Sequence, residues 1–192
     1  MEEFLNPDLL KQHLLAGGIY LAAYEMFKSS LVGRPRDFYL SGMENGKEII
    51  SPDYESEVIT LDRKYLYRAS ALWWRKQGVL TDADVELAAS IRDHRDEIAH
   101  NIPRFLGTSE GIIRLDLLES MFMLLSKIDQ WCIREIEIPC ISDFDKREPT
   151  QEDLDGAMSA NMIFLSLIIP IAFGDDSLMR SLYEEWKKRT RQ

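Results

Sequence analysis

The sequence has few of the residues that build disulfide scaffolds or metal centres. Among 192 residues there are two cysteines, Cys132 and Cys140, and three histidines. The cysteines have no CxxC spacing and no histidine beside them, so they do not form a zinc-binding pattern. Two thiols in a chain of this length favour a reducing compartment over a disulfide scaffold. We therefore expect no metal site.

Long apolar runs are also absent. The longest, Met162 to Phe173, has twelve residues and contains Pro170. It is too short to span a bilayer and predicts a buried core helix. The first residues, "MEEFLNPDLL", are acidic and have no signal-peptide pattern. We expect a cytoplasmic protein without a membrane partner.

Motifs for common enzyme chemistries are missing as well. The chain has no G-x-x-x-x-G-K-[ST], no G-x-G-x-x-G after a strand, no G-x-S-x-G and no H-E-x-x-H. These absences argue against a P-loop nucleotidase, a dinucleotide-binding enzyme, an α/β-hydrolase and a zinc protease. We expect no cofactor, and we attribute the many carboxylates to an acidic surface.

Positive charge is in short supply. The chain has 23 Lys and Arg against 33 Asp and Glu, for a net charge of −10, and its pI is about 4.8. Such a body is not attracted as a whole to nucleic acid or to an anionic membrane. Any contact with RNA must use a local basic site or a partner.

Long amphipathic segments are abundant, and they predict an all-α domain over residues 1–192 with five to six helices. Asn6 and Pro7 begin the first helix, in which Gly17 and Gly18 are expected to pack closely against another helix. Residues 33–57 contain glycines and prolines that predict an irregular excursion, with room for a short strand or a helical turn.

The remaining helices are expected at residues 58–78, 81–103, 109–137, from 150 onward, and 176–189. Thr81 and Asp84 form a capping-box pattern for the second of these, and Thr150 with Asp153 is expected to start the fifth helix of the chain. Residues 139–149 form an acidic connector, and residues 187–192 form a basic tail that the helix dipole explains.

The stretch "RDHRDEIAHNIP", residues 92–103, holds two of the three histidines. Asp96 and His100 are four apart on a helix, so a hydrogen bond between them is feasible. Arg95 and His100 are five apart, about 140° around the axis and roughly 7.5 Å along it. They meet at one phosphate only if the helix loosens, if the arginine reaches around, or if a second copy completes the site.

These three residue types suit RNA cleavage without a metal. A histidine that titrates near neutrality can move a proton at the 2′-hydroxyl or at the 5′-oxygen. A guanidinium can hold the charge that builds on the phosphoryl oxygens. The alternative interpretation of Arg95, Asp96 and His100 is a solvated helix end with local ion pairs, where His94 and Arg92 are surface residues.

The segment "RDEIAH" resembles the R-x4-6-H motif of the HEPN superfamily (higher eukaryotes and prokaryotes nucleotide-binding), with Arg95, Asp96 and His100 in the motif positions. The resemblance implies an all-α bundle that dimerises to form a metal-independent ribonuclease site, in a toxin or phage-defence protein. It further implies an antitoxin or a neighbouring defence protein as a partner. Ile102 departs from the subgroup whose antitoxin adenylylates a tyrosine at that position. Some members only bind, so a non-catalytic module that binds a nucleotide or a partner protein is the alternative.

Other residues are candidates for RNA contact. Arg92 shares a helix face with Asp96 and His100, and Asn101 either stabilises the turn after His100 or contacts substrate. The segment "RKYLYRASALWWRKQG" interleaves aromatic residues with cations and can track a backbone while stacking bases; its cations are Arg63, Lys64, Arg68, Arg75 and Lys76. The alternative places its aromatics in the core and its cations in water. Trp73 and Trp74 point about 100° apart, so we expect at most one to be central to any face.

Overall fold

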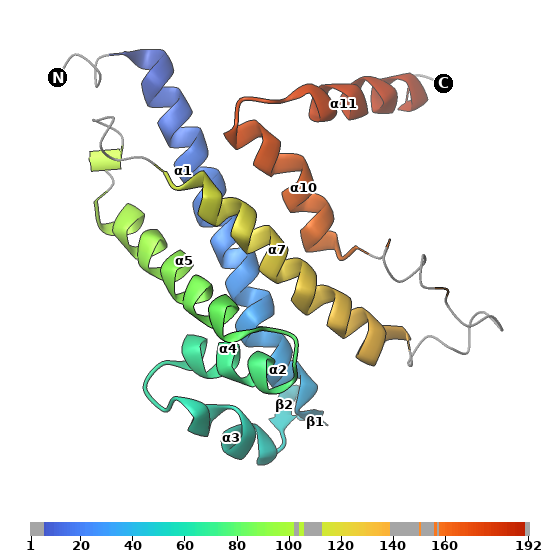
Figure 1. The fold of residues 1–192 in the computed structure, drawn as a ribbon. Helices are drawn as coiled ribbons and strands as arrows, with labels where there is room; N and C mark the ends of the chain where they lie inside the picture. The colour runs from blue at the N-terminus through green and yellow to red at the C-terminus, as the bar shows by residue number, and fades with distance from the viewer. Residues whose placement is uncertain are drawn as a thin grey trace.

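The computed structural model describes residues 6–101, 104–105, 113–138, 150, 156 and 158–190. It confirms the all-α prediction, with one small antiparallel hairpin as the only sheet of the described residues. The first helix is the longest and lies alongside three of the other long helices (Figure 1). Those longer than ten residues are α1 (Pro7–Lys28), α4 (Leu66–Lys76), α5 (Asp82–His100), α7 (Leu115–Cys132), α10 (Ala160–Ala172) and α11 (Ser177–Thr190).

Helix α1 begins where the sequence predicts. The Asn6 side chain accepts hydrogen bonds from the backbone N–H groups of Asp8 and Leu9, at 3.1 and 3.3 Å. Pro7 follows at the first helical position, where its missing N–H costs nothing. The helix packs against α5, α7 and α10. One continuous core of buried apolar side chains therefore runs from α1 to α10.

The expected excursion starts later than residue 33. Helix α1 continues through a π-helical turn, Ser29–Gly33, into α2, Arg34–Phe38. Pro35 follows closely after this turn, and the carbonyl of Leu31, four residues before it, accepts from the Trp74 indole N–H in place of the backbone N–H that proline lacks. The irregular part is the hairpin of β1 (Leu40–Glu44) and β2 (Lys47–Ile50), followed by α3 (Asp53–Glu57).

The hairpin turn is built from Asn45 and Gly46, whose φ angles are 50° and 77°. An Asn-Gly pair with two positive φ angles is the type I′ pattern that joins two antiparallel strands. The sequence therefore held a specific hairpin signal within the predicted excursion.

The helix expected over residues 58–78 is wrong in its first part. A short 3-10 turn, Ile59–Leu61, comes first, and α4 begins only at Leu66. The Asp62 carboxylate accepts hydrogen bonds from the N–H groups of Lys64 and Tyr65, at 3.0 and 3.1 Å. This side-chain turn competes with helical hydrogen bonds and ends the preceding turn.

Two other predicted helix starts are too early. Helix α7 begins at Leu115 rather than at residue 109; Ser109 and Glu110 themselves lie outside the described residues. Helix α10 begins at Ala160, with Ser159 as its N-cap, rather than near Thr150. Asp153 and the predicted connector at residues 139–149 also lie outside the described part of the chain.

The apolar run on α10 is not fully buried, contrary to the prediction. Met162 and Leu165 face the core, whereas Ile163 is 50% exposed and Phe164 is 48% exposed. Pro170 does not end the helix, which continues to Ala172. One side of α10 therefore remains apolar and uncovered by the described residues.

The expected close packing at Gly17 and Gly18 is not found. A Cβ atom on Gly17 would lie 3.8 Å from the Ile113 side chain, which is an ordinary contact, and one on Gly18 would meet no described atom within 4 Å. Both glycines instead line a shallow apolar hollow beside α5, together with Ile98 and Phe105.

The two adjacent tryptophans are both fully buried, although they point in different directions from α4. The Trp74 indole N–H donates to the carbonyl of Leu31, at 2.9 Å, and that of Trp73 donates to the Tyr39 hydroxyl, at 3.2 Å. The segment around α2 packs on a second side of α4, so both Trp73 and Trp74 point into the core from different sides of this helix.

Candidate nucleic-acid interface

The candidate motif lies on the C-terminal half of α5. Ile91, His94 and Ile98 face the core, while Arg95 is half-buried and His100 is exposed at the end of the helix. The helix stays regular to its end, because the N–H of Asn101 donates to the Glu97 carbonyl at 3.0 Å. The helix therefore does not loosen before His100.

Arg95 turns away from His100 and toward α1. Its Nη2 lies 3.3 Å from Glu25 Oε1, and its Nη1 lies 3.1 Å from Asp96 Oδ1. Its guanidinium also lies over the Tyr24 ring, 5.4 Å from the centroid. Burial opposes the charge, but Asp96 and Glu25 outweigh it and raise the pKa of Arg95. Arg95 is thus a fixed cation that already has two anionic neighbours.

The expected hydrogen bond between Asp96 and His100 is not formed, because Asp96 pairs with Arg95. His100 makes no hydrogen bond to any described residue. The Asn101 side chain donates to the Glu97 carbonyl at 3.3 Å, which closes the helix end as the turn interpretation predicts. Within one chain, the described structure does not bring Arg95 and His100 to a common point.

An open cleft of about 370 Å³ lies where α1, the start of α4 and α5 meet. We call it the cationic cleft. Its lining combines four cations, three tyrosines, one carboxylate and one leucine: Lys28, Lys64, Arg92, Arg95, Tyr24, Tyr65, Tyr67, Asp96 and Leu66. The cleft therefore joins the motif helix to one end of the basic aromatic segment.

Contacts between cations and rings organise this cleft. The Arg92 guanidinium lies 5.9 Å from the Tyr65 ring centroid and 5.8 Å from that of Tyr67. Lys64 Nζ lies 4.8 Å from the centroid of the Tyr65 ring. Arg92 also donates to Asp93, at 2.9 and 3.2 Å, which places this pair at the rim. The Tyr65 ring remains 48% exposed and can accept a stacked base.

Tyr24 supplies a neutral hydroxyl to the cleft. Burial is the main cause that raises the pKa of Tyr24 to about 12, and the nearby Asp96 adds to the shift. The phenol therefore stays protonated near neutral pH and can donate a hydrogen bond, but it does not act as a base.

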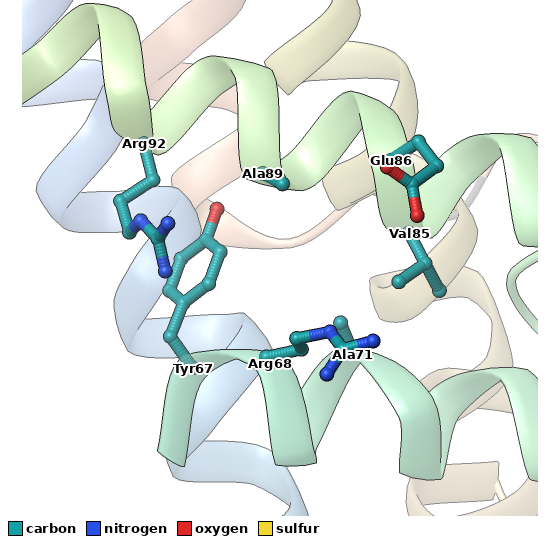
Figure 2. Close-up of a pocket in the computed structure, with 7 residues that line it drawn as sticks. All are labelled: Tyr67, Arg68, Ala71, Val85, Glu86, Ala89 and Arg92. Atoms are coloured by element: carbon teal, nitrogen blue, oxygen red, sulfur yellow. The ribbon is translucent and has the colours of Figure 1, made fainter. Parts of the chain in front are cut away.

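A smaller pocket of about 70 Å³ lies beside the cleft, between α4 and α5. Figure 2 shows Arg92 and Tyr67 at one end of it, and Val85 and Glu86 at the other. The Tyr67 hydroxyl donates to the Ala88 carbonyl at 2.8 Å, which fixes the ring as a wall between pocket and cleft. This space suits a few waters rather than a nucleotide.

Most cations of the basic aromatic segment are paired with carboxylates and lie outside the cleft. Arg63 contacts Glu55 at 3.3 Å and Arg68 contacts Asp62 at 3.1 Å. The two remaining pairs are Arg75 with Asp82 and Lys76 with Glu57. Lys64 is the member of this segment that lines the cleft. The basic aromatic segment therefore contributes one cation, Lys64, to the cleft and forms no track of unpaired cations along α4.

His94 is buried, so the prediction of a surface histidine is wrong. Its Nε2 accepts a hydrogen bond from the backbone N–H of Arg114, at 3.1 Å, and its ring packs edge-on against Tyr20 and Phe105. Burial lowers the pKa of His94, although the nearby Glu97 opposes the shift. His94 therefore links α5 to the start of α7 as a neutral imidazole.

Three residues of α1 belong to the cleft region and were not foreseen: Tyr24, Glu25 and Lys28. They lie about 70 positions before Arg95 in the chain, and the hydrogen bond from Arg95 to Glu25 spans that separation. No local motif marks them, because only the packing of α1 against α5 brings them to this place.

The described residues contain no group of three histidine, cysteine, aspartate or glutamate side chains able to hold a metal ion. No described helix has the length and apolar character needed to cross a bilayer. Cys132 is a free, buried thiol whose pKa burial raises to about 11, and Cys140 lies outside the described residues.

Comparison with known proteins found no matching family model, no similar curated protein and no similar solved structure.

Proposed function

We propose that this protein is a metal-independent endoribonuclease of the HEPN type that acts as a dimer, as a toxin or a phage-defence effector. The observation that carries the proposal is the gathering of Arg92, Arg95, Lys28 and Lys64 around one open cleft beside exposed Tyr65. A chain with a net charge of −10 needs such a local site to hold RNA.

In the proposed reaction, the 2′-hydroxyl of the RNA attacks the adjacent phosphorus and the bond to the 5′-oxygen breaks. The products are a 2′,3′-cyclic phosphate and a 5′-hydroxyl. Arg95, assisted by Arg92, stabilises the charge on the phosphoryl oxygens, and a base stacks on Tyr65. His100 of a second copy takes the proton from the 2′-hydroxyl or gives one to the departing 5′-oxygen, and solvent water completes the other transfer. We place His100 in a second copy because within one chain α5 directs Arg95 toward α1 and leaves His100 at the exposed helix end.

The central test is RNA cleavage by the purified protein in EDTA. Arg95→Ala and His100→Ala are each expected to reduce cleavage by about 100- to 1,000-fold, the usual effect of losing one charge-stabilising or proton-transferring group. Arg75→Ala is the matched control, because Arg75 pairs with Asp82 and does not line the cleft. Full activity of the His100→Ala variant would contradict the proposal.

Mixing the two inactive variants tests the composite site. If Arg95 and His100 act from different copies, a mixed dimer restores one intact site, and the mixture regains about a quarter of the parent activity. A mixture that stays as inactive as its components would show that both groups act within one chain.

A non-catalytic module that binds a nucleotide or a partner protein is the second candidate. The pairing of Arg95 with Glu25 and Asp96 favours its partner-protein form, because a phosphate of RNA or of a nucleotide must compete with two carboxylates for the guanidinium. This candidate predicts binding at the cleft without cleavage at high protein concentration and low salt. A cognate antitoxin or a neighbouring defence protein is the partner that the HEPN resemblance suggests.

A further inference from the structure

Helix α11 packs less against the rest of the described chain than any other helix. It has fourteen residues, and none of them is buried. Figure 1 shows it leaving the end of α10 and extending away from α1, α5 and α7. An isolated helix of this length is marginal in water, so a covering surface is needed to stabilise it.

The exposed side chains of α11 have a regular pattern. Leu178, Met179, Leu182, Tyr183 and Trp186 are between 40% and 58% exposed. Their spacing of three, four and seven residues places them along one side of the helix. The adjoining end of α10 adds Phe173, which is 48% exposed. Together they form an uncovered apolar stripe.

The two ends of α11 carry opposite charge. Asp175 and Asp176 precede the helix, whereas Lys187, Lys188 and Arg189 lie in its last turn. Asp176 pairs with Arg180 and Lys187 pairs with Glu184 within the chain, so the charge offered to a second copy comes from Asp175 at one end and from Lys188 and Arg189 at the other. In an antiparallel pair of such helices centred on Leu182, the acidic start of one faces the basic end of the other. The same arrangement places Trp186 of one copy beside Leu178 of the other. A parallel pair would instead set like charges against each other.

We propose that α11 pairs in antiparallel fashion with α11 of a second copy of this chain through the apolar stripe. The contact is self-complementary, as a two-fold interface requires. Because two short helices bury less than a standard interface, the pairing is reversible and micromolar in strength. The inference does not rest on the proposed ribonuclease function, since α11 does not line the cationic cleft.

The first experiment measures the mass of the full chain by sedimentation over a range of concentrations. Leu182→Glu is expected to weaken the association at least about 100-fold, because each substitution acts twice in a symmetric pair. Ser181→Glu introduces the same charge off the stripe and is expected to leave the mass unchanged. Circular dichroism verifies that both variants keep the helical bundle.

Several outcomes would overturn the pairing. A parent protein that stays monomeric up to about 200 μM would do so, because a micromolar contact is saturated at that concentration. A mass that Leu182→Glu leaves unchanged at every concentration would overturn the pairing, whereas loss of one association step with a residual dimer at the motif helices would support it. Amide hydrogens of α11 that become protected from exchange only when anionic lipid vesicles are added would assign the stripe to a membrane surface.

Cysteine cross-linking tests the direction of the pair in a Cys140→Ser background, where Cys132 is buried. Leu182→Cys is expected to form a disulfide-linked dimer under mild oxidation, whereas Leu178→Cys alone is not. Cross-linking by both variants would overturn the antiparallel arrangement.

RNA cleavage measured on Leu182→Glu keeps the two proposals separate: retained cleavage with lost pairing supports the contact and leaves the ribonuclease proposal intact.

Discussion

Two histidines six residues apart on α5 have opposite environments. His94 is buried against Tyr20 and Phe105 and accepts a backbone hydrogen bond, whereas His100 is exposed at the helix end. Helical geometry separates their directions by about 240°, so one can face the core while the other faces solvent. His94 therefore serves stability, and His100 remains available for chemistry.

The buried state of His94 predicts a dependence of stability on pH. Burial lowers its pKa in the folded protein, so the unfolded chain binds a proton first as the pH falls. The contribution of neutral His94 to the free energy of unfolding is complete above about pH 6.5, the pKa of histidine in the unfolded chain. It is lost as the pH falls from there through the lower pKa of the folded protein. His94→Gln is expected to reduce the free energy of unfolding at pH 7 by about 1 kcal/mol and to flatten its decline toward pH 5.

Urea unfolding at several pH values measures this effect. His100→Gln is the control, because an exposed side chain without a described hydrogen bond is expected to change the free energy of unfolding by less than about 0.5 kcal/mol. An unchanged slope between pH 7 and pH 5 in His94→Gln would assign the pH dependence to other groups.

At the scale of elements, α5 is held at its start by a capping box that also connects to α7. The Thr81 Oγ1 accepts from the Asp84 N–H at 3.2 Å, and the Asp84 carboxylate accepts from the Thr81 N–H at 2.8 Å. Lys127 on α7 donates to both oxygens of Asp84, each at 2.8 Å. Burial opposes ionisation of Asp84, but these donors outweigh it and lower its pKa.

Removing this carboxylate is expected to destabilise the bundle. Asp84→Ala loses half of the capping box and the partner of Lys127, and should cost about 2 kcal/mol, whereas Thr81→Ala should cost about 1 kcal/mol. Since Lys127 is 45% exposed, its coupling to Asp84 should stay below about 1 kcal/mol in a double-mutant cycle with Lys127→Met. The stabilisation is present above about pH 4 and is lost as the pH falls through the lowered folded pKa of Asp84.

Chemical denaturation of the four proteins of this cycle supplies the measurement. Lys76→Met is a suitable comparison, because its exposed pair with Glu57 lies outside any helix cap. Equal costs for Asp84→Ala and Lys76→Met would contradict a special role for the capping box.

The sequence predicts a helix start well where a capping side chain is present and no other nearby side chain forms a turn or offers a second cap. Asn6 and Thr81 are such positions, and both were placed correctly. It fails at α4, where Asp62 forms a turn before the helix, and at α10, where Ser159 is the cap and Thr150 is not. Capping residues are common in any sequence, so only tertiary packing decides which of them begins a helix.

The cleft could be predicted only in part. Arg92, Arg95 and Lys64 were identified from local patterns, and the structure brings all three to its lining. Tyr24 and Lys28 could not be identified, because their place depends on the packing of α1 against α5. The pairing of Arg68 and Arg75 with carboxylates was equally out of reach, since a run of cations gives no information about the acidic residues that fold beside it.

At the scale of the whole molecule, the net charge of −10 limits how RNA can bind. Only the cationic cleft offers clustered positive charge among the candidate residues, and three of its four cations already contact carboxylates: Lys28 and Arg95 contact Glu25, and Arg92 contacts Asp93. We expect the cleft to neutralise about two to three phosphates, so that the logarithm of RNA affinity falls with the logarithm of salt at a slope of about −1.4 to −2.

Binding of a short single-stranded RNA to His100→Ala, measured from about 50 to 300 mM salt, tests this expectation without cleavage. Lys64→Ala should make the slope shallower by about 0.7, whereas Lys76→Ala, which does not line the cleft, should not change it. A steep slope, near that of a protein with six or more phosphate contacts, would locate the RNA-binding surface elsewhere.

The placement of the tryptophans gives this protein two separate optical reporters. Three of the four indoles, those of Trp73, Trp74 and Trp131, form one cluster with ring centroids 4.8 to 6.2 Å apart. Trp73 and Trp74 are fully buried and Trp131 is half-buried, so we expect this cluster to emit at short wavelength and to report whether the bundle is folded. Trp186 is 58% exposed on α11, so it emits at longer wavelength and is accessible to iodide. Quenching of the red edge of the spectrum therefore follows the covering of α11 in unlabelled protein, while the blue edge follows the integrity of the core.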